Sequence, residues 1–307
     1  MRRTLKRILS GIFALLFIVS CSMPVDAAKG KIKNYIMTDV KNPAYILITT
    51  DQGFKPKKQI KKIVNSYSSA KWVTKYTYNK KNQVIKTVET YNMSKQKQTI
   101  IYSYRNDGKI KETKSSFILK GSKPKKIIRK YDKKGQEEYF EMTSYIPGKE
   151  DNKETYIIKK DNKYSGNNIV SQTSYHDIKY TYEEEYADDY DGPRHVNTEK
   201  TCKTTYKYKN GLPVKCIGET SNSIPFWAAP GFFKYTNVCS YDSKGRVSKS
   251  GTAKIKYYTS GKEKGLVKYD GCYDYIYKFD KDGDIVTIVN KNPKTKEKVR
   301  VYQITYK

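Results

Sequence analysis

Tyrosine alternates with lysine and threonine at a period of two along much of the chain. The alternating tyrosines are Tyr76/Tyr78, Tyr102/Tyr104, Tyr180/Tyr182, Tyr206/Tyr208 and Tyr273/Tyr275/Tyr277. A period of two places each set on one face of a β-strand and the intervening lysines on the other. Tyr and Thr also favour strands, because they pack well on a pleated surface. The pattern predicts amphipathic strands with a buried tyrosine face and a solvated lysine face.

Turn sequences follow these strands at a fixed offset. They are YNKKNQVI from Tyr78, YRNDGKI from Tyr104, YDKKGQE from Tyr131, YKNGLPV from Tyr208, YDSKGRV from Tyr241 and FDKDGDIV from Phe279. Asn or Gly stands where a hairpin needs positive φ, and an apolar residue usually restarts the next strand. Tyr78, Tyr104 and Tyr131 are 26 and 27 residues apart, enough for two strands and two turns. We therefore expect an all-β, antiparallel meander of repeated hairpins over residues 71–307.

The segment from Tyr241 to Val247, YDSKGRV, resembles the tyrosine–aspartate (YD) repeat of the RHS family, whose unit ends in Tyr-Asp-x-x-Gly-Arg-Leu. Weaker copies begin at Tyr131 and Phe279, where Gly135 and Gly283 keep the spacing. The resemblance implies curved or open β-sheets, which serve as shells, spacers or adhesive stalks in that family. The irregular spacing and few copies here favour a small exported protein over a toxin shell.

Residues 29–70 interrupt the repeat and are expected to form an N-terminal unit. Ala44–Ile48 has the pattern of a strand. Pro56–Tyr67 reads as a short basic amphipathic helix, because Ile60, Ile63, Val64 and Tyr67 would share one helical face. Such a helix either packs against the sheet or contacts anionic lipid. Residues 146–168 are polar and are expected to include a long loop.

The N-terminus has the features of an export signal. Met1–Arg7 carries four positive charges, and the apolar run Ile8–Val19 is too short to span a bilayer. Cleavage after Ala27 would remove residues 1–27 and free the protein. Alternatively, Ile18-Val19-Ser20-Cys21 resembles a bacterial lipobox, so that residues 1–20 are removed and Cys21 is lipidated. Both alternatives place the protein outside the cell, secreted or lipid-anchored to the outer face of the membrane.

The charge suggests a class of partner. The chain has 61 Lys+Arg against 31 Asp+Glu, a formal charge of +30. Removal of Arg2, Arg3, Lys6 and Arg7 leaves +26, which favours anionic cell-wall polymers or acidic glycans through counterion release. We expect no specific nucleic acid partner, and membrane contact only through a lipid anchor. The alternative is structural, because dispersed lysines also protect strand edges from aggregation.

Cysteines suggest disulfides in an exported protein. Four remain after cleavage, and an even number allows complete pairing. Cys202 and Cys216 flank the turn at Asn210 and are expected to meet across the hairpin, which leaves Cys239 with Cys272. Zinc is not expected, because Cys-x-x-Cys spacing is absent.

Two further segments could carry function. The acidic segment 183–191 offers oxygen ligands but lacks EF-hand order, so that its weak cation candidates carry no metal prediction. These candidates are Glu184, Asp188, Asp189 and Asp191. The segment 224–233, IPFWAAPGFF, is either an exposed aromatic platform for a sugar or partner, or a plug over the sheet. Its aromatic residues are Phe226, Trp227, Phe232 and Phe233.

No hydrolase, phosphate-loop or thiol–histidine motif is present, so no catalytic residue and no cofactor is expected. The sequence favours an exported, non-catalytic interaction protein that binds anionic wall polymer or glycan through a basic face. The alternatives are a wall- or glycan-directed hydrolase using the acids of 183–191, and a passive spacer or shell.

Overall fold

The computed structural model describes residues 46–49, 52–54, 56–118, 123–146, 149–181, 195–210, 212–222 and 232–307. Every regular element within these ranges is a β-strand. The strands are β1 Ile46–Thr49, β2 Gln52–Phe54, β3 Ile60–Tyr67, β4 Ala70–Tyr78, β5 Val84–Tyr91, β6 Gln96–Tyr104, β7 Ile110–Ile118, β8 Lys125–Tyr131, β9 Glu137–Ile146, β10 Lys149–Ser165, β11 Asn168–Thr181, β12 His195–Lys209, β13 Leu212–Asn222, β14 Phe232–Tyr241, β15 Val247–Ser250, β16 Ala253–Lys254, β17 Lys256–Tyr257, β18 Val267–Tyr269, β19 Asp274–Phe279, β20 Ile285–Lys291 and β21 Lys298–Tyr306.

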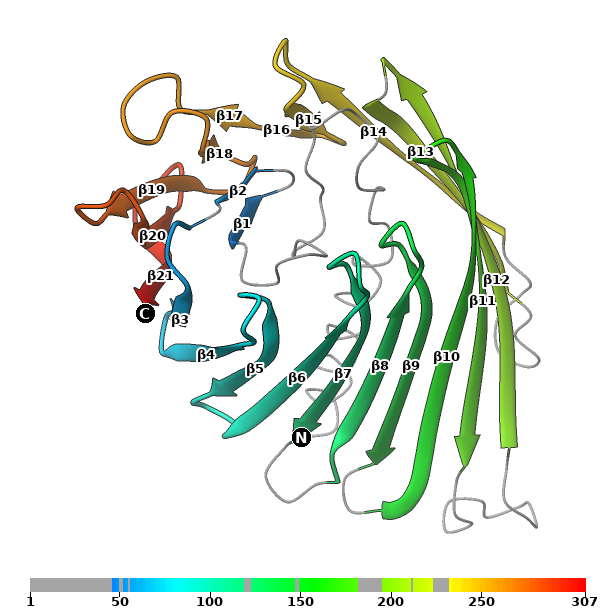
Figure 1. Cartoon of the computed structure of the whole chain (residues 1–307). Helices are drawn as coiled ribbons and strands as arrows, with labels where there is room; N and C mark the ends of the chain where they lie inside the picture. Colours follow the sequence, from blue (N-terminus) through cyan, green and yellow to red (C-terminus); the bar gives the residue numbers. More distant parts are fainter. Residues whose placement is uncertain are drawn as a thin grey trace.

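Strands β3–β21 follow one another around a closed antiparallel barrel (Figure 1). The barrel closes because β21 pairs with β3, from Arg300 opposite Tyr67 to Tyr306 opposite Ile60. β1 and β2 form a separate two-stranded sheet. The predicted all-β meander is therefore confirmed, but its sheet is closed rather than open.

The helix expected at Pro56–Tyr67 is wrong, because Ile60–Tyr67 forms β3. Ile60 and Val64 are buried, and β3 bonds β4 on one side and β21 on the other. An isolated helix of this length is marginal in water, and Ile, Val and Tyr suit a strand. The hydrogen bonds to two neighbouring strands thus stabilise this segment as a strand, despite its local helical pattern.

The long loop expected in 146–168 is also wrong. β10 occupies Lys149–Ser165 and is the longest strand of the barrel. Its ladder with β11 extends from Lys153 opposite Thr181 to Ser165 opposite Asn168, and it also pairs with β9. Backbone bonding on both sides holds this polar segment extended.

Four of the six turns predicted from the repeat share one hydrogen-bond pattern. In these four turns, the Asx Oδ1 accepts the backbone N–H groups two and four residues later, at 2.9–3.0 Å. The Asx residues are Asn79, Asp132, Asp242 and Asp280. The fourth residue of the turn has positive φ, as at Gly245 (74°), and Asn82 takes that place at 59°. An Asx side chain and a residue tolerating positive φ thus define the turn.

The repeated tyrosines also form hydrogen bonds to an earlier strand through their hydroxyls. Each hydroxyl donates at 2.5–2.8 Å to a backbone carbonyl at or next to the start of a preceding strand. These pairs are Tyr78 with Ile60, Tyr104 with Val84, Tyr208 with Ile169, Tyr241 with Pro213, Tyr257 with Val247, Tyr277 with Val267 and Tyr306 with Ile285. Most of the accepting residues are fully buried. The tyrosines thus join one end of neighbouring strands inside the barrel.

Candidate functional site

Two polar surfaces of the barrel are candidates for function, one outside and one inside. On β4, Tyr76 and Tyr78 pack against the main buried cluster, so that Lys71 and Lys75 point outward. The same alternation turns lysines of β3, β5 and β6 outward. We call the set the lysine face, and it consists of Lys62, Lys71, Lys75, Lys86 and Lys97.

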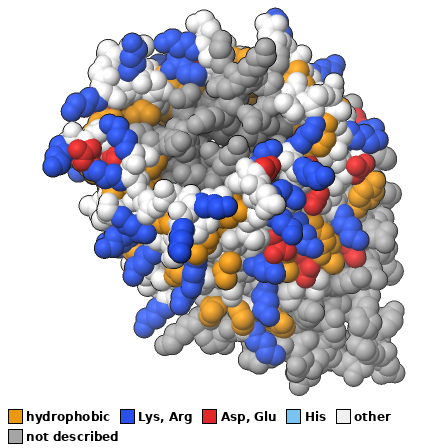
Figure 2. Space-filling model, in the orientation of Figure 1, with side chains coloured by type: hydrophobic (Ala, Val, Ile, Leu, Met, Phe, Trp, Pro, Cys, Tyr) orange, Lys and Arg blue, Asp and Glu red, His pale blue; other side chains and the backbone are white. Residues whose placement is uncertain are grey.

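Within β3–β6, no carboxylate lies on the lysine face. Glu89 is the one carboxylate in β3–β6, and it faces inward, where it accepts a hydrogen bond from Thr74 Oγ1 at 2.9 Å. Lys62 and Lys75 are direct cross-strand partners. Like charges in that position destabilise a sheet, and an anion between them would remove the repulsion. Figure 2 shows lysines over β4–β6, whereas acidic side chains lie over strands further along the barrel.

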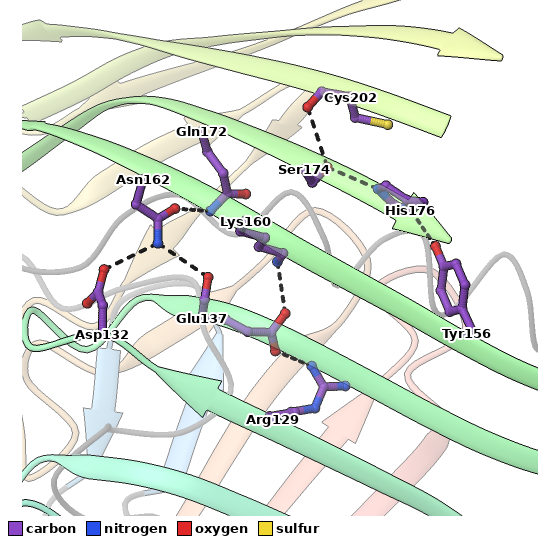
Figure 3. A network of polar contacts seen from close by, with 10 residues as sticks. All are labelled: Arg129, Asp132, Glu137, Tyr156, Lys160, Asn162, Gln172, Ser174, His176 and Cys202. Carbon is purple, nitrogen blue, oxygen red and sulfur yellow. Dashed lines mark hydrogen bonds and ion pairs between the residues drawn. The ribbon is translucent and has the colours of Figure 1, made fainter. Parts of the chain in front are cut away.

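Inside the barrel wall, a charged cluster joins β8, β9 and β10 (Figure 3). Glu137 pairs with Lys160 Nζ at 2.8 Å and with Arg129 Nη1 at 2.5 Å. The Arg129 guanidinium also lies 4.7 Å from the centre of the Phe140 ring. Burial alone would raise the pKa of Glu137, but the charges of Lys160 and Arg129 lower this pKa overall. The cluster therefore holds an ionised carboxylate within the wall.

An amide chain continues from this cluster (Figure 3). Asn162 Nδ2 donates to Asp132 Oδ2 at 3.2 Å and to the Glu137 carbonyl at 3.4 Å. Gln172 Nε2 donates to Asn162 Oδ1 at 2.7 Å. Asp132 is the Asx residue of a repeat turn, and it also accepts a hydrogen bond from the Tyr164 hydroxyl. This chain ties the repeat turn to β10 and β11.

A histidine lies further along the same wall. His176 has Tyr156 Oη 2.5 Å from Nδ1 and Ser174 Oγ 3.0 Å from Nε2. The Ser–His distance suits a nucleophile and its base. However, the third group is a phenol, which does not stabilise an imidazolium as a carboxylate does. Ser174 also reaches the Cys202 carbonyl at 3.4 Å, and both Ser174 and His176 are buried. The geometry supports a link between β10, β11 and β12.

The cysteine pairing expected across β12 and β13 is corrected by their register. Cys216 lies opposite Tyr206, and Cys202 lies opposite Thr220. Cys202 and Cys216 are thus four ladder positions apart, roughly 13 Å at the usual strand rise, beyond the reach of a disulfide. Cys239 Sγ lies 3.9 Å from Ser250 Oγ. Cys272 is an exposed free thiol, so the Cys239–Cys272 bridge is not formed in this structure.

Several sequence candidates lie outside the described residues. They are Cys21, Phe226, Trp227, Glu184, Asp188, Asp189 and Asp191. Phe232 and Phe233 begin β14, opposite Ser221 and Thr220 of β13, but their side chains are outside the described part. Among the described residues, no three His, Cys, Asp or Glu side chains converge on a metal site. No helix in the described ranges is long and apolar enough to cross a membrane.

The inner network was missed because the sequence shows its residues only as polar positions. Lys160 and Asn162 alternate along β10, and Gln172, Ser174 and His176 do so along β11. The period of two was the available signal that each set shares one face. The sequence alone does not show which polar residues of β10 and β11 become neighbours, because that depends on how the turn between them sets the register.

No family model matches the chain, and no curated protein matches it. Among solved structures, it is similar to a porin-like protein from Bacteroides vulgatus ATCC 8482. That similarity covers 82% of this chain and 99% of the other, at 12% identity and a TM-score of 0.36.

The chain is also similar to TcdB2–TccC3 without the hypervariable C-terminal region and to a Photorhabdus luminescens Tc holotoxin pore. Each match covers 76% of this chain and 14% of the other, at 15% identity and a TM-score of 0.22. No activity follows from similarities this low.

Proposed function

We propose that this protein is an exported, non-catalytic YD-repeat-like barrel that binds anionic wall polymers or acidic glycans through the lysine face. The observation that carries the proposal is the arrangement of lysines on β3–β6, where the one carboxylate is turned inward. The N-terminal signal sequence supports export, and the repeat turns support the family resemblance.

The physical basis is counterion release. A polyanion that neutralises several ammonium groups releases its condensed cations, so affinity falls steeply as salt rises. The Lys62–Lys75 pair adds a local contribution, because a bound anion relieves their repulsion. Lysine suits a flexible phosphate or carboxylate polymer, since it acts as a point charge without demanding bidentate geometry.

The test measures binding of polyphosphate and polygalacturonate to the mature protein by calorimetry at several salt concentrations. The face variant carries Lys62→Gln, Lys75→Gln, Lys86→Gln and Lys97→Gln. A matched control carries Lys126→Gln, Lys130→Gln, Lys159→Gln and Lys163→Gln on β8 and β10. Both variants lose the same charge, so a difference between them reports position.

The face variant should bind at least about tenfold more weakly, and its slope of log K against log salt should become shallower by about 3. The control should stay near wild type. Equal losses in both variants would show that net charge alone acts. An affinity that does not change with salt concentration, or release of cleaved polymer, would contradict the proposal.

A further inference from the structure

We propose that one end of the barrel's inner face is a binding site for a glycan containing N-acetylhexosamine units. The site lies on β20, β21, β3, β4 and β5, and it goes beyond the proposed function because it faces away from the lysine face. We call it the aromatic–amide site, and its residues are Asn65, Tyr67, Trp72, Tyr91, Asn290 and Arg300.

Strand register brings these residues together in two adjacent rows. In one row, Asn65 lies opposite Trp72, and Trp72 lies opposite Tyr91. In the other row, Arg300 lies between Asn290 and Tyr67. Trp72 shares its face of β4 with Tyr76, which packs against the main buried cluster, so both rows face inward.

The site lies at the end opposite the tyrosine-bonded turns. A meander alternates its turns between the two ends, and the turns next to these rows are 68–69, 92–95 and 292–297. The aromatic side chains at this end are accessible, because Tyr67 is 43% exposed and Trp72 and Tyr91 are half-buried. Mouths of β-barrels are a common place for small-molecule sites.

The aromatic residues provide flat apolar surfaces. Trp72 and Tyr91 stack with ring centroids 4.7 Å apart and an interplanar angle of 19°. The Arg300 guanidinium lies 5.5 Å from the centre of the Tyr67 ring, and its Nη1 donates to Tyr302 Oη at 3.2 Å. Rigid aromatic side chains beside a polar group suit the C–H faces and hydroxyls of a pyranose ring.

Two acceptors in the site have no partner within the described residues. Asn290 is 4% exposed, and its Oδ1 makes no hydrogen bond. Asn65 Oδ1 is also buried without a partner. A buried acceptor without a donor is unfavourable, so both oxygens favour a ligand that brings donors. An N-acetyl amino sugar supplies amide N–H and hydroxyl donors, and its acetyl carbonyl can accept from Arg300.

The probe is a tetramer of N-acetylglucosamine, added to a Trp227→Phe protein in which Trp72 is the remaining tryptophan. We expect a saturable change in Trp72 fluorescence and a matching calorimetric isotherm. Asn65→Ala and Asn290→Ala should each weaken binding about tenfold, the loss of one hydrogen bond. Neither should lower the melting temperature, because each removes an unsatisfied acceptor.

Asn162→Ala is the matched control, because the Asn162 amide makes three hydrogen bonds within the wall network of Figure 3. It should lower the melting temperature and leave the dissociation constant unchanged. If Asn65→Ala and Asn290→Ala instead lower stability like this control without changing affinity, the two residues are structural and the proposal is wrong. Absence of saturable binding would also overturn it.

Two comparisons separate this proposal from the polyanion function. The lysine-face variant should keep its affinity for the tetramer, and Asn290→Ala should keep its affinity for polyphosphate. Equal affinity for a glucose tetramer, which lacks the acetamido group, would overturn the assignment to N-acetylhexosamine. Loss of polyphosphate binding in Asn290→Ala would show that the two sites are one.

Discussion

At the scale of residues, each repeated tyrosine stabilises the barrel through a hydrogen bond of its hydroxyl as well as through the packing of its ring. A buried phenol must find a partner, and the carbonyl next to a turn lies at the point where the regular ladder begins. Burial raises the pKa of Tyr78 and Tyr131 to about 12. The folded barrel thus requires these phenols to stay protonated.

Tyr78→Phe should destabilise the barrel by about 1 kcal/mol, because the Ile60 carbonyl loses its donor while the ring packing is kept. In the wild type, the raised pKa gives stability that is fully present below pH 10 and is lost as pH rises through about 12. Urea unfolding at neutral and alkaline pH checks both, and the variant should lose less at alkaline pH. Tyr175→Phe is the control, because Tyr175 is 52% exposed, and it should change little.

Glu137 neutralises two cationic side chains of the inner wall, Arg129 and Lys160. Glu137→Gln should lower the free energy of unfolding by about 3 kcal/mol, because Lys160 and Arg129 would lose their counter-charge. The lowered pKa of Glu137 means that its stabilisation is present above the ordinary glutamate pKa of about 4.3 and is lost as pH falls below it. Glu112→Gln, which alters a pair with the exposed Lys114, should change stability far less. Similar losses in the two variants would contradict a special role for the inner cluster.

At the scale of elements, a short segment before β3 secures the seam of the barrel. Lys57 N donates to Asp284 Oδ1 at 2.8 Å, and Lys58 pairs with Asp280 at 2.9 Å. Gln59 Nε2 donates to Asn82 Oδ1 at 2.6 Å. The segment therefore connects the turn after β19 with the turn after β4, beside the β21–β3 junction.

Asp284→Ala should loosen this seam, because Asp284 is fully buried and accepts the Lys57 N–H. Hydrogen exchange should become faster for amides of β3 and β21, whereas amides of the β10–β11 ladder should keep their protection. Asp107→Ala is a control, because Asp107 accepts a similar backbone bond from Lys109 in a turn away from the seam. Uniformly faster exchange throughout the barrel would contradict a local role.

The sequence predicted the elements with a strong local signal and missed those set by distant partners. The Asp242 turn and the strand restarting at Val247 were predictable, because turn chemistry lies within a few residues. β3 was mistaken for a helix, because its partner β21 lies more than two hundred residues away. The aromatic–amide site was equally hidden, because Asn290 and Trp72 come to lie in adjacent rows of one sheet only when β21 pairs with β3.

At the scale of the whole molecule, alternation along the strands gives the barrel two chemically different surfaces. Tyrosines and buried aliphatic residues occupy the inside at the end with the tyrosine-bonded turns. Amide and charged side chains line part of the inner wall. Lysines occupy the outside, where β3–β6 lack an opposing outward charge. One repeat pattern thus supplies both an apolar, tyrosine-bonded interior and a lysine-rich exterior.

Because β3 finds its second partner in β21, the order of synthesis matters for this fold. A ribosome releases β3 early, and one edge of that strand waits unpaired until Lys298–Tyr306 has emerged. The barrel consequently closes only after β21 has been synthesised. Loss of the nine-residue strand β21 would leave the edges of β20 and β3 unpaired, and both edges could then pair with other molecules.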